Sequence, residues 1–271
     1  MTLPPALGHE VHGTGPDLVL LHGVGLDRAM WERCLPALTH RHRVTLVDLR
    51  GHGTSPAAEP GVALRELAAD VAALLTGPAH LVGFSLGALV AQQIAVEHPE
   101  LTSALTLVSS VAERSQEERA AVLRRRERAR QDFAGSAHAA VERWFSAEWR
   151  RRDPELAKAV LDRLMTTDRT SYLACYDVFA TADAELWPHL PGIKAPVTAV
   201  TGADDPGSTP AMCRALADRI PGARAVIVPN TRHLLPLERP NVLSKVILDA
   251  SRGAGNCASN HIRPAAEERP E

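Results

Sequence analysis

Short runs of apolar residues recur along the chain, separated by segments in which apolar residues repeat at helical spacing. The apolar runs lie at residues 17–23, 43–51, 80–85, 104–110, 195–202 and 223–229. Runs of this length are typical of strands buried on both faces of a parallel sheet, and amphipathic segments between them, such as residues 64–77, are typical of crossover helices. The pattern predicts an α/β fold with a mostly parallel central sheet flanked by helices.

The alternation of strand and helix stops at residues 112–186, where the sequence is charged, helical in pattern and nearly free of strand signals. We therefore expect a helical cap inserted into a core formed by residues 1–111 and 187–250. Residues 251–271 are polar and aperiodic, which predicts a disordered tail. The basic run at 123–130 is accompanied by glutamates, which indicates a solvated helix face and no nucleic-acid site.

Composition and charge exclude few classes of function. The 271 residues are 45% hydrophobic and 23% charged with a formal net charge of -2, so the overall charge favours neither nucleic acid nor an anionic membrane as partner. The start of the chain lacks a signal-peptide pattern and no stretch reaches membrane-helix length, which predicts a cytoplasmic protein. The four cysteines are scattered without zinc-ligand spacing, so we expect no metal and no cofactor.

A serine stands where one buried strand turns into a long helix. Residues 81–84 are apolar, residues 86–98 repeat at helical spacing, and Ser85 lies between them with Gly83 and Gly87 on either side. Small residues at these positions relieve the crowding of a sharp strand-to-helix turn. The G-x-S-x-G pattern predicts a nucleophile elbow, which exposes a serine hydroxyl above the sheet.

A serine nucleophile needs a histidine base and a carboxylate that orients it. The loop after the strand at 195–202 contains Asp204 and Asp205, and the loop after the strand at 223–229 contains His233. Both loops follow predicted strands and come in the chain order serine, aspartate, histidine. The sequence thus predicts a catalytic triad of Ser85, one of these two aspartates and His233.

An acyl-transfer site also needs donors for the oxyanion of the tetrahedral intermediate. We expect one donor to be the backbone N–H of Leu86, which follows the serine, and the other to be the N–H of Val24 in the His-Gly-Val-Gly loop after the first predicted strand. His22 in this loop is interpreted as a structural hydrogen-bonding residue.

Five segments together resemble the α/β-hydrolase superfamily over residues 7–250: HGVG, DLRGHGTS, GFSLG, GADDP and TRHLLPLERP. The resemblance implies Ser85 as nucleophile, His233 as base and Asp205, the aspartate before a proline, as acid. It also implies Val24 and Leu86 as oxyanion donors. In the second segment it suggests that Asp48, Arg50 and Gly51 shape a loop and that His52 is structural.

The cap sequence is similar to that of 3-oxoadipate enol-lactonases, which hydrolyse an acidic enol-lactone in aromatic degradation. This resemblance rests on the triplet Arg143-Trp144-Phe145 and on the segment that follows it. It implies that Arg143 and Trp144, together with Trp31, contact substrate. An arginine beside aromatic rings can clamp a substrate carboxylate, although a solvated cap surface is the simpler interpretation of Arg143.

The sequence therefore predicts a hydrolase that cleaves a small lactone or carboxylic ester through a Ser85 acyl-enzyme, with 3-oxoadipate enol-lactone as the favoured substrate. A general carboxylesterase, a thioesterase, a carbon-carbon hydrolase and a cofactor-free haloperoxidase stay open. Epoxide hydrolases and haloalkane dehalogenases are disfavoured because they carry aspartate where this chain has Ser85. A receptor-like protein that binds a ligand without turnover is the alternative of another class. The acyl group, the pathway and the oligomeric state are left undetermined.

Overall fold

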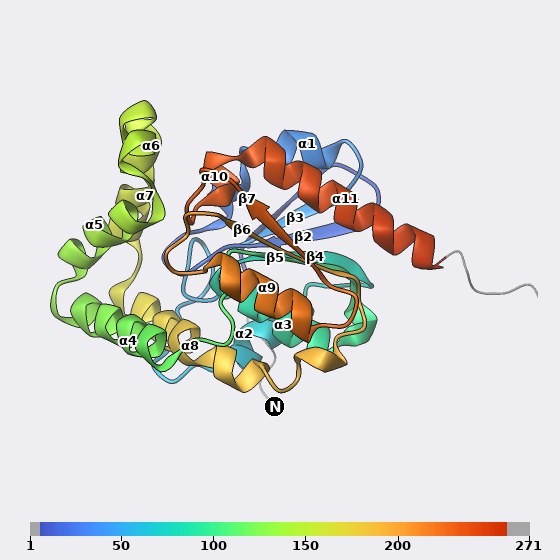
Figure 1. Ribbon diagram of the computed structural model, residues 1–271, viewed down its shortest axis with the longest axis horizontal. Coiled ribbons are helices and arrows are strands. Elements are labelled where there is room, and N and C mark those ends of the chain that lie inside the picture. Colours follow the sequence, from blue (N-terminus) through green and yellow to red (C-terminus); the bar gives the residue numbers. More distant parts are fainter. Residues whose placement is uncertain (1–5, 259–271) are drawn as a thin grey trace, which may run out of the picture.

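A seven-stranded sheet forms the centre of the molecule (Figure 1). The computed structural model describes residues 6–258. The strand order is β1-β3-β2-β4-β5-β6-β7. The strands are β1 (His9–His12), β2 (Asp17–Leu21), β3 (Arg43–Val47), β4 (Ala79–Phe84), β5 (Thr102–Val108), β6 (Val197–Gly202) and β7 (Arg224–Val228). Six of them are parallel, and β1 pairs antiparallel with β3 at one edge.

The six parallel strands begin and end within a few residues of the predicted apolar runs, which confirms the α/β fold with a mostly parallel sheet. β4 is buried at every position, as expected for a central strand covered on both faces. β1 was not predicted because its four residues alternate little and three of them are exposed. An exposed edge strand gains its hydrogen bonds from β3 and needs no apolar run.

Helices cover both faces of the sheet (Figure 1). One face carries α1 (Leu35–Thr39) and α11 (Pro240–Ala258), and the other carries α2 (Leu64–Ala72), α3 (Leu86–Glu97) and α9 (Pro210–Arg219). The short helix α10 (Leu235–Glu238) precedes α11. Single turns lie at η1 (Arg28–Trp31), η2 (Pro99–Leu101) and η3 (Leu190–Gly192). The hydrophobic core extends from the sheet into both layers.

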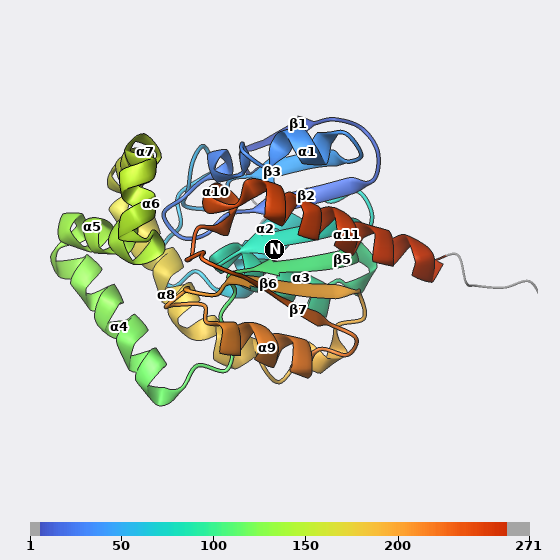
Figure 2. The same ribbon diagram turned by 45° about the horizontal axis from the view of Figure 1, so that its top comes forward.

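Five consecutive helices stand beside this core (Figures 1 and 2). They are α4 (Gln116–Gln131), α5 (Phe133–Trp144), α6 (Ala147–Arg152), α7 (Pro154–Thr166) and α8 (Arg169–Leu186). All lie between β5 and β6 in the chain, within the segment for which a helical cap was predicted, and the name cap is used below for α4 to α8. The buried pair Arg114–Asp183, joined at 2.8 Å, connects the segment before α4 to the end of α8.

The predicted tail begins too early. α11 continues to Ala258, so residues 251–258 are helical, and the rest of the predicted tail lies outside the described residues. Ser251 also contacts His80 of β4, its Oγ lying 2.8 Å from the ring Nδ1. The polar composition of 251–258 is typical of disorder. A helix that has already formed can continue through such residues, because each glycine costs only about 1 kcal/mol and only proline stops the helix abruptly.

Candidate active site

Ser85 occupies a sharp turn between β4 and α3. Its φ of 52° and ψ of -111° are unusual for a residue with a side chain, and the turn leaves no room beside it. A Cβ on Gly83 would lie 2.1 Å from the Gly87 carbonyl oxygen, and one on Gly87 would lie 2.5 Å from that of Leu21. The two glycines are therefore sterically required, as the nucleophile-elbow pattern predicts.

Backbone hydrogen bonds hold this turn to both neighbouring strands. The N–H of Ser85 donates to the Val108 carbonyl at the end of β5 (2.9 Å), and the N–H of Gly87 donates to the His22 carbonyl after β2 (3.0 Å). Within residues 6–258 the N–H of Leu86, between them, donates no hydrogen bond. The turn thus carries one unoccupied backbone donor next to the serine.

Asp205 and His233 meet at the ends of β6 and β7. The His233 Nδ1 lies 2.7 Å from Asp205 Oδ2, and Asp205 Oδ1 accepts the N–H groups of Gly207 (2.9 Å) and Ser208 (3.0 Å). Because a carboxylate only accepts, Nδ1 carries a proton and Nε2 is left to accept one. The pair has the arrangement of a base oriented by an acid.

The environment of Asp205 favours its charged form. Burial, with 3% of the residue exposed, opposes ionisation, but the adjacent His233 ring and the two backbone N–H groups outweigh it, and the pKa of Asp205 is lowered. Asp204 is exposed and its side chain takes no part in the contact with His233. The preference for Asp205 over Asp204 therefore has a structural basis.

One cavity brings together most of the predicted site residues. It is lined by side chains from the core loops and from the cap, including Ser85, Asp205, His233, Val24, Arg143, Trp144, Arg125, Tyr172 and Tyr176. No hydrogen bond joins Ser85 to His233 among the described residues, although both border the same space. Such contacts are often long before substrate binds. Val24 also has a backbone N–H without an acceptor in this part of the chain.

The cap contacts the histidine directly. The Trp144 ring stacks against His233 with the ring centroids 6.0 Å apart, and the Trp144 carbonyl accepts the backbone N–H of His233 at 3.2 Å. The Phe84 ring also lies close to the imidazole, with the ring centroids 4.9 Å apart. The base therefore lies in a largely apolar setting formed by core and cap together.

Two arginines of the cap line this cavity without a carboxylate partner. Arg143 donates only to the Ala139 carbonyl of its own helix (3.3 Å), and neither Arg143 nor Arg125 forms an ion pair within residues 6–258. Burial lowers the pKa of the Arg143 guanidinium, and the positive charge of Arg125 lowers it further. The cavity is therefore lined by two guanidinium groups that form no ion pair within the described residues.

The prediction for Trp31 was wrong and Arg125 was missed. Trp31, at the end of η1, is fully buried in the core and does not line the cavity. Arg125 was assigned to a solvated helix face. Val122 and Ala129 are the buried residues of α4, and Arg125 lies three residues after Val122 on the same face. This spacing of three residues from a buried position could have predicted from the sequence that Arg125 faces the protein.

No group of three or more His, Cys, Asp or Glu side chains in residues 6–258 has the geometry to hold a metal ion. None of the helices in this part of the chain has the length and apolar character needed to span a bilayer.

The chain combines a mostly parallel sheet with a serine at a strand-to-helix turn, and an aspartate and a histidine that follow in the chain are hydrogen-bonded to each other. These features define the class of α/β-hydrolases. The family model described as "Alpha/beta hydrolase family" matches residues 18–246. The chain belongs to this family.

Comparisons with individual proteins agree with the predicted resemblance. The chain is 54% identical over 103 residues to a pimeloyl-[acyl-carrier protein] methyl ester esterase of Aeromonas hydrophila, an alignment that covers 37% of this chain and only 41% of that protein. It is 26% identical over 248 residues to 3-oxoadipate enol-lactonase 2 of Acinetobacter baylyi, covering 89% and 91%. The crystal structure of the enol-lactonase from Burkholderia xenovorans LB400 superposes with a TM-score of 0.83 at 30% identity, covering 90% and 95%.

Proposed function

We propose that the protein is a serine hydrolase that cleaves a small carboxylic ester or lactone through an acyl-enzyme on Ser85. The observation that carries this proposal is the single cavity bordered by the strained Ser85 turn and by His233, whose Nδ1 is held by Asp205 at 2.7 Å. Its whole-length similarity to enol-lactonases supports the same chemistry.

The residues act in two steps. His233 Nε2 accepts the Ser85 hydroxyl proton while Oγ attacks the substrate carbonyl carbon, and the N–H groups of Val24 and Leu86 stabilise the resulting oxyanion. The carbon-oxygen bond to the leaving group breaks, and His233 returns its proton to the departing oxygen. In a lactone this oxygen stays attached to the acyl chain. His233 then activates water, which releases the acid and frees Ser85.

The favoured substrate is an acidic lactone, with 3-oxoadipate enol-lactone as the specific case. The unpaired guanidinium of Arg143 supports this choice, because a buried arginine without an acid partner suits a substrate carboxylate. Arg125 borders the same space and adds to the positive charge. Trp144 supplies an apolar wall next to His233.

Hydrolysis of a methyl ester is the second candidate. The 54% identity over 103 residues to a methyl ester esterase favours it over the thioesterase and carbon-carbon hydrolase alternatives, for which no particular observation speaks. A ligand-binding protein without turnover would retain the triad geometry but hydrolyse nothing at a steady rate.

Two measurements test the proposal. A fluorophosphonate probe should label Ser85 and no other residue, as read by peptide mass spectrometry. In a panel of enol-lactones and methyl esters, each with and without a free carboxylate, steady-state hydrolysis should be fastest for acidic lactones. A single slow acylation event in place of turnover would instead identify a binding protein, and labelling elsewhere would refute the role of Ser85.

A further inference from the structure

Two buried histidines connect the loop that carries Val24 to the loop after β3. His22 Nε2 accepts the N–H of Leu49 (2.9 Å), and His52 Nε2 accepts the N–H of Gly25 (2.9 Å). The two rings meet edge to face with centroids 4.9 Å apart. The loops are neighbours because they follow the adjacent parallel strands β2 and β3. Each histidine thus ties one loop to the other.

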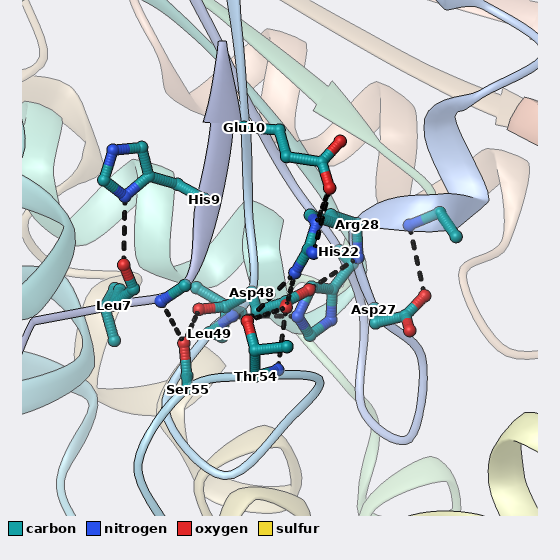
Figure 3. Close-up of polar contacts among 12 residues, drawn as sticks. Leu7, His9, Glu10, His22, Asp27, Arg28, Asp48, Leu49, Thr54 and Ser55 are labelled. Carbon is teal, nitrogen blue, oxygen red and sulfur yellow. Dashed lines mark hydrogen bonds and ion pairs between the residues drawn. The ribbon is translucent and has the colours of Figure 1, made fainter.

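Asp48 provides a third connection between these loops, visible in Figure 3. Its Oδ1 accepts the backbone N–H of Arg28, and its Oδ2 accepts the backbone N–H of Thr54, each at 2.9 Å. The Arg28 guanidinium also pairs with the Asp48 carboxylate. Asp48 fixes the far end of the Val24 loop, whereas the two histidines act next to Val24 itself.

The hydrogen bonds determine which nitrogen of each ring carries the proton. A backbone N–H can only donate, so Nε2 must be the unprotonated nitrogen of both His22 and His52. On the other side, Nδ1 of His22 lies 2.8 Å from the Gly23 carbonyl and Nδ1 of His52 lies 3.1 Å from the Arg50 carbonyl, and both carbonyls only accept. Both imidazoles are therefore neutral, with the proton on Nδ1.

Burial stabilises this neutral state. The exposed fraction is 0% for His22 and 3% for His52, and removal from solvent lowers the pKa of His22 to about 4 and that of His52 to about 3. Neither ring therefore gains a second proton at neutral pH, which would convert Nε2 from an acceptor into a donor facing a backbone N–H.

These contacts control the two peptide groups around Val24. The Val24 N–H belongs to the same planar peptide as the Gly23 carbonyl, which accepts from His22 Nδ1–H and from the Leu26 N–H (3.2 Å). Fixing that carbonyl directs the Val24 N–H the opposite way. The next peptide is held through the Gly25 N–H on His52. A flip of either peptide would break its histidine bond.

From this arrangement we infer that His22 and His52, in their neutral Nδ1–H form, are positioning residues that orient the Val24 amide as an oxyanion donor. The inference rests on the proposed function, in which that amide stabilises the tetrahedral intermediate. Neither histidine touches the reacting atoms. Their effect should therefore appear in the transition state and be small in the binding of substrate.

The test compares His52→Ala with His52→Gln, whose side-chain oxygen can reach the position of Nε2 and accept the Gly25 N–H. For p-nitrophenyl acetate, we expect kcat of His52→Ala to fall about 10- to 100-fold while KM changes less than about 3-fold. The inhibition constant of a trifluoromethyl ketone, which forms a tetrahedral adduct with serine, should rise by the same factor as kcat falls. His52→Gln should recover most of both losses.

His80→Ala is the matched control. His80 is also buried and hydrogen-bonded on both nitrogens, to Ser251 and Thr106, but it lies near the start of β4 at the end of the strand away from Ser85. We expect this variant to unfold at a lower temperature and to keep kcat and ketone affinity. If His52→Ala retains kcat within about 3-fold, or if His80→Ala loses kcat equally, the positioning role is overturned.

A measurement on the unaltered protein covers the case in which His52→Ala does not fold. Long-range ¹H–¹⁵N spectra should show protonated Nδ1 and unprotonated Nε2 for His22 and His52, unchanged between pH 8 and pH 5. A proton on either Nε2 in that range would overturn the inference. Ser85→Ala separates the two proposals, because wild-type turnover in that variant refutes the proposed function, whereas its inactivity together with full kcat in His52→Ala refutes only the positioning role.

Discussion

The core loops and the cap differ in whether their polar side chains at the cavity have partners within the chain. On the core side of the cavity, the chain supplies the hydrogen bonds that orient Asp205 and the Nδ1 of His233, and it satisfies both ring nitrogens of the neutral His22 and His52 next to the Val24 loop. On the cap side, Arg143 meets no carboxylate in the described structure. Under the proposed function, the core side is preorganised for bond cleavage, and the unpaired Arg143 of the cap would meet a negative charge on the substrate.

Under the proposed function, we expect the core loops to carry out the chemistry and the cap to select the substrate. Some other arginines of the cap do pair with carboxylates: Arg126 and Arg130 pair with Asp177, and Arg163 pairs with Asp27. Arg128, Arg150 and Arg151 of the cap also form no ion pair within the described residues, so Arg125 and Arg143 are distinguished by lining the cavity. The predictions below test each side of this division.

Ser85→Ala should have the largest effect. A nucleophile works as part of a unit with its base, so we expect kcat to fall by about five to six powers of ten. The folded structure should persist, because alanine tolerates the turn conformation as well as serine does. Hydrolysis rates and thermal unfolding measure the two quantities. Appreciable turnover in the folded variant would place the chemistry outside the core loops.

Asp205→Asn should lower kcat about 10³- to 10⁴-fold, because an amide cannot hold the Nδ1–H tautomer of His233 in the same way. Asp204→Asn is the matched control, since Asp204 is exposed and its neighbour makes the contact to the histidine. We expect near wild-type rates for the control. A larger loss in Asp204→Asn than in Asp205→Asn would reverse the assignment of the acid.

Arg143→Ala tests the cap side. Loss of one charge-assisted contact should cost roughly 1.5–3 kcal/mol, or about ten- to a hundredfold in kcat/KM, for lactones that carry a carboxylate. Neutral lactones of the same ring size should lose much less. Arg128→Ala serves as control because Arg128 lies on the exposed side of α4. Equal losses for charged and neutral substrates would refute the binding of a substrate carboxylate by Arg143 and favour a general esterase.

Glu238 is an exception within the core and should give the smallest effect. It is 7% exposed and accepts the N–H of Arg232 (3.2 Å), but burial raises its pKa from 4.5 to about 7. Because the folded state binds this proton more tightly, stability falls as pH rises from about 4.5 to about 7. Glu238→Gln keeps the acceptor and should raise the free energy of unfolding at pH 8 by ~1–3 kcal/mol.

Chemical denaturation at pH 4 and pH 8 checks this expectation. At pH 4 the glutamate is mostly protonated in both states, so the variant and the wild type should differ little. Equal stabilities at pH 8 as well would show that Glu238 is solvated enough to ionise normally.

The nucleophile turn and the strands were predictable from the sequence because their causes are local. Gly83 is required by the backbone of Gly87, four residues away, and the G-x-S-x-G spacing reveals the turn even though Gly87 is required by the more distant end of β2. The short apolar runs indicate strands that are buried on both faces of the sheet, and such strands occur mainly in parallel sheets covered by helices. The order of serine, aspartate and histidine follows from the order of the strands.

Only the tertiary structure decided which side chains of a helix or loop face the cavity, the core or another loop. Arg125 was expected on a solvated helix face but lines the cavity, and Trp31 was expected to contact substrate but lies in the core. The tautomers of His22 and His52 likewise depend on backbone groups about 27 residues away in the chain. Sequence spacing describes short-range sterics and periodicity, whereas these contacts are set by how loops and helices distant in the chain pack together.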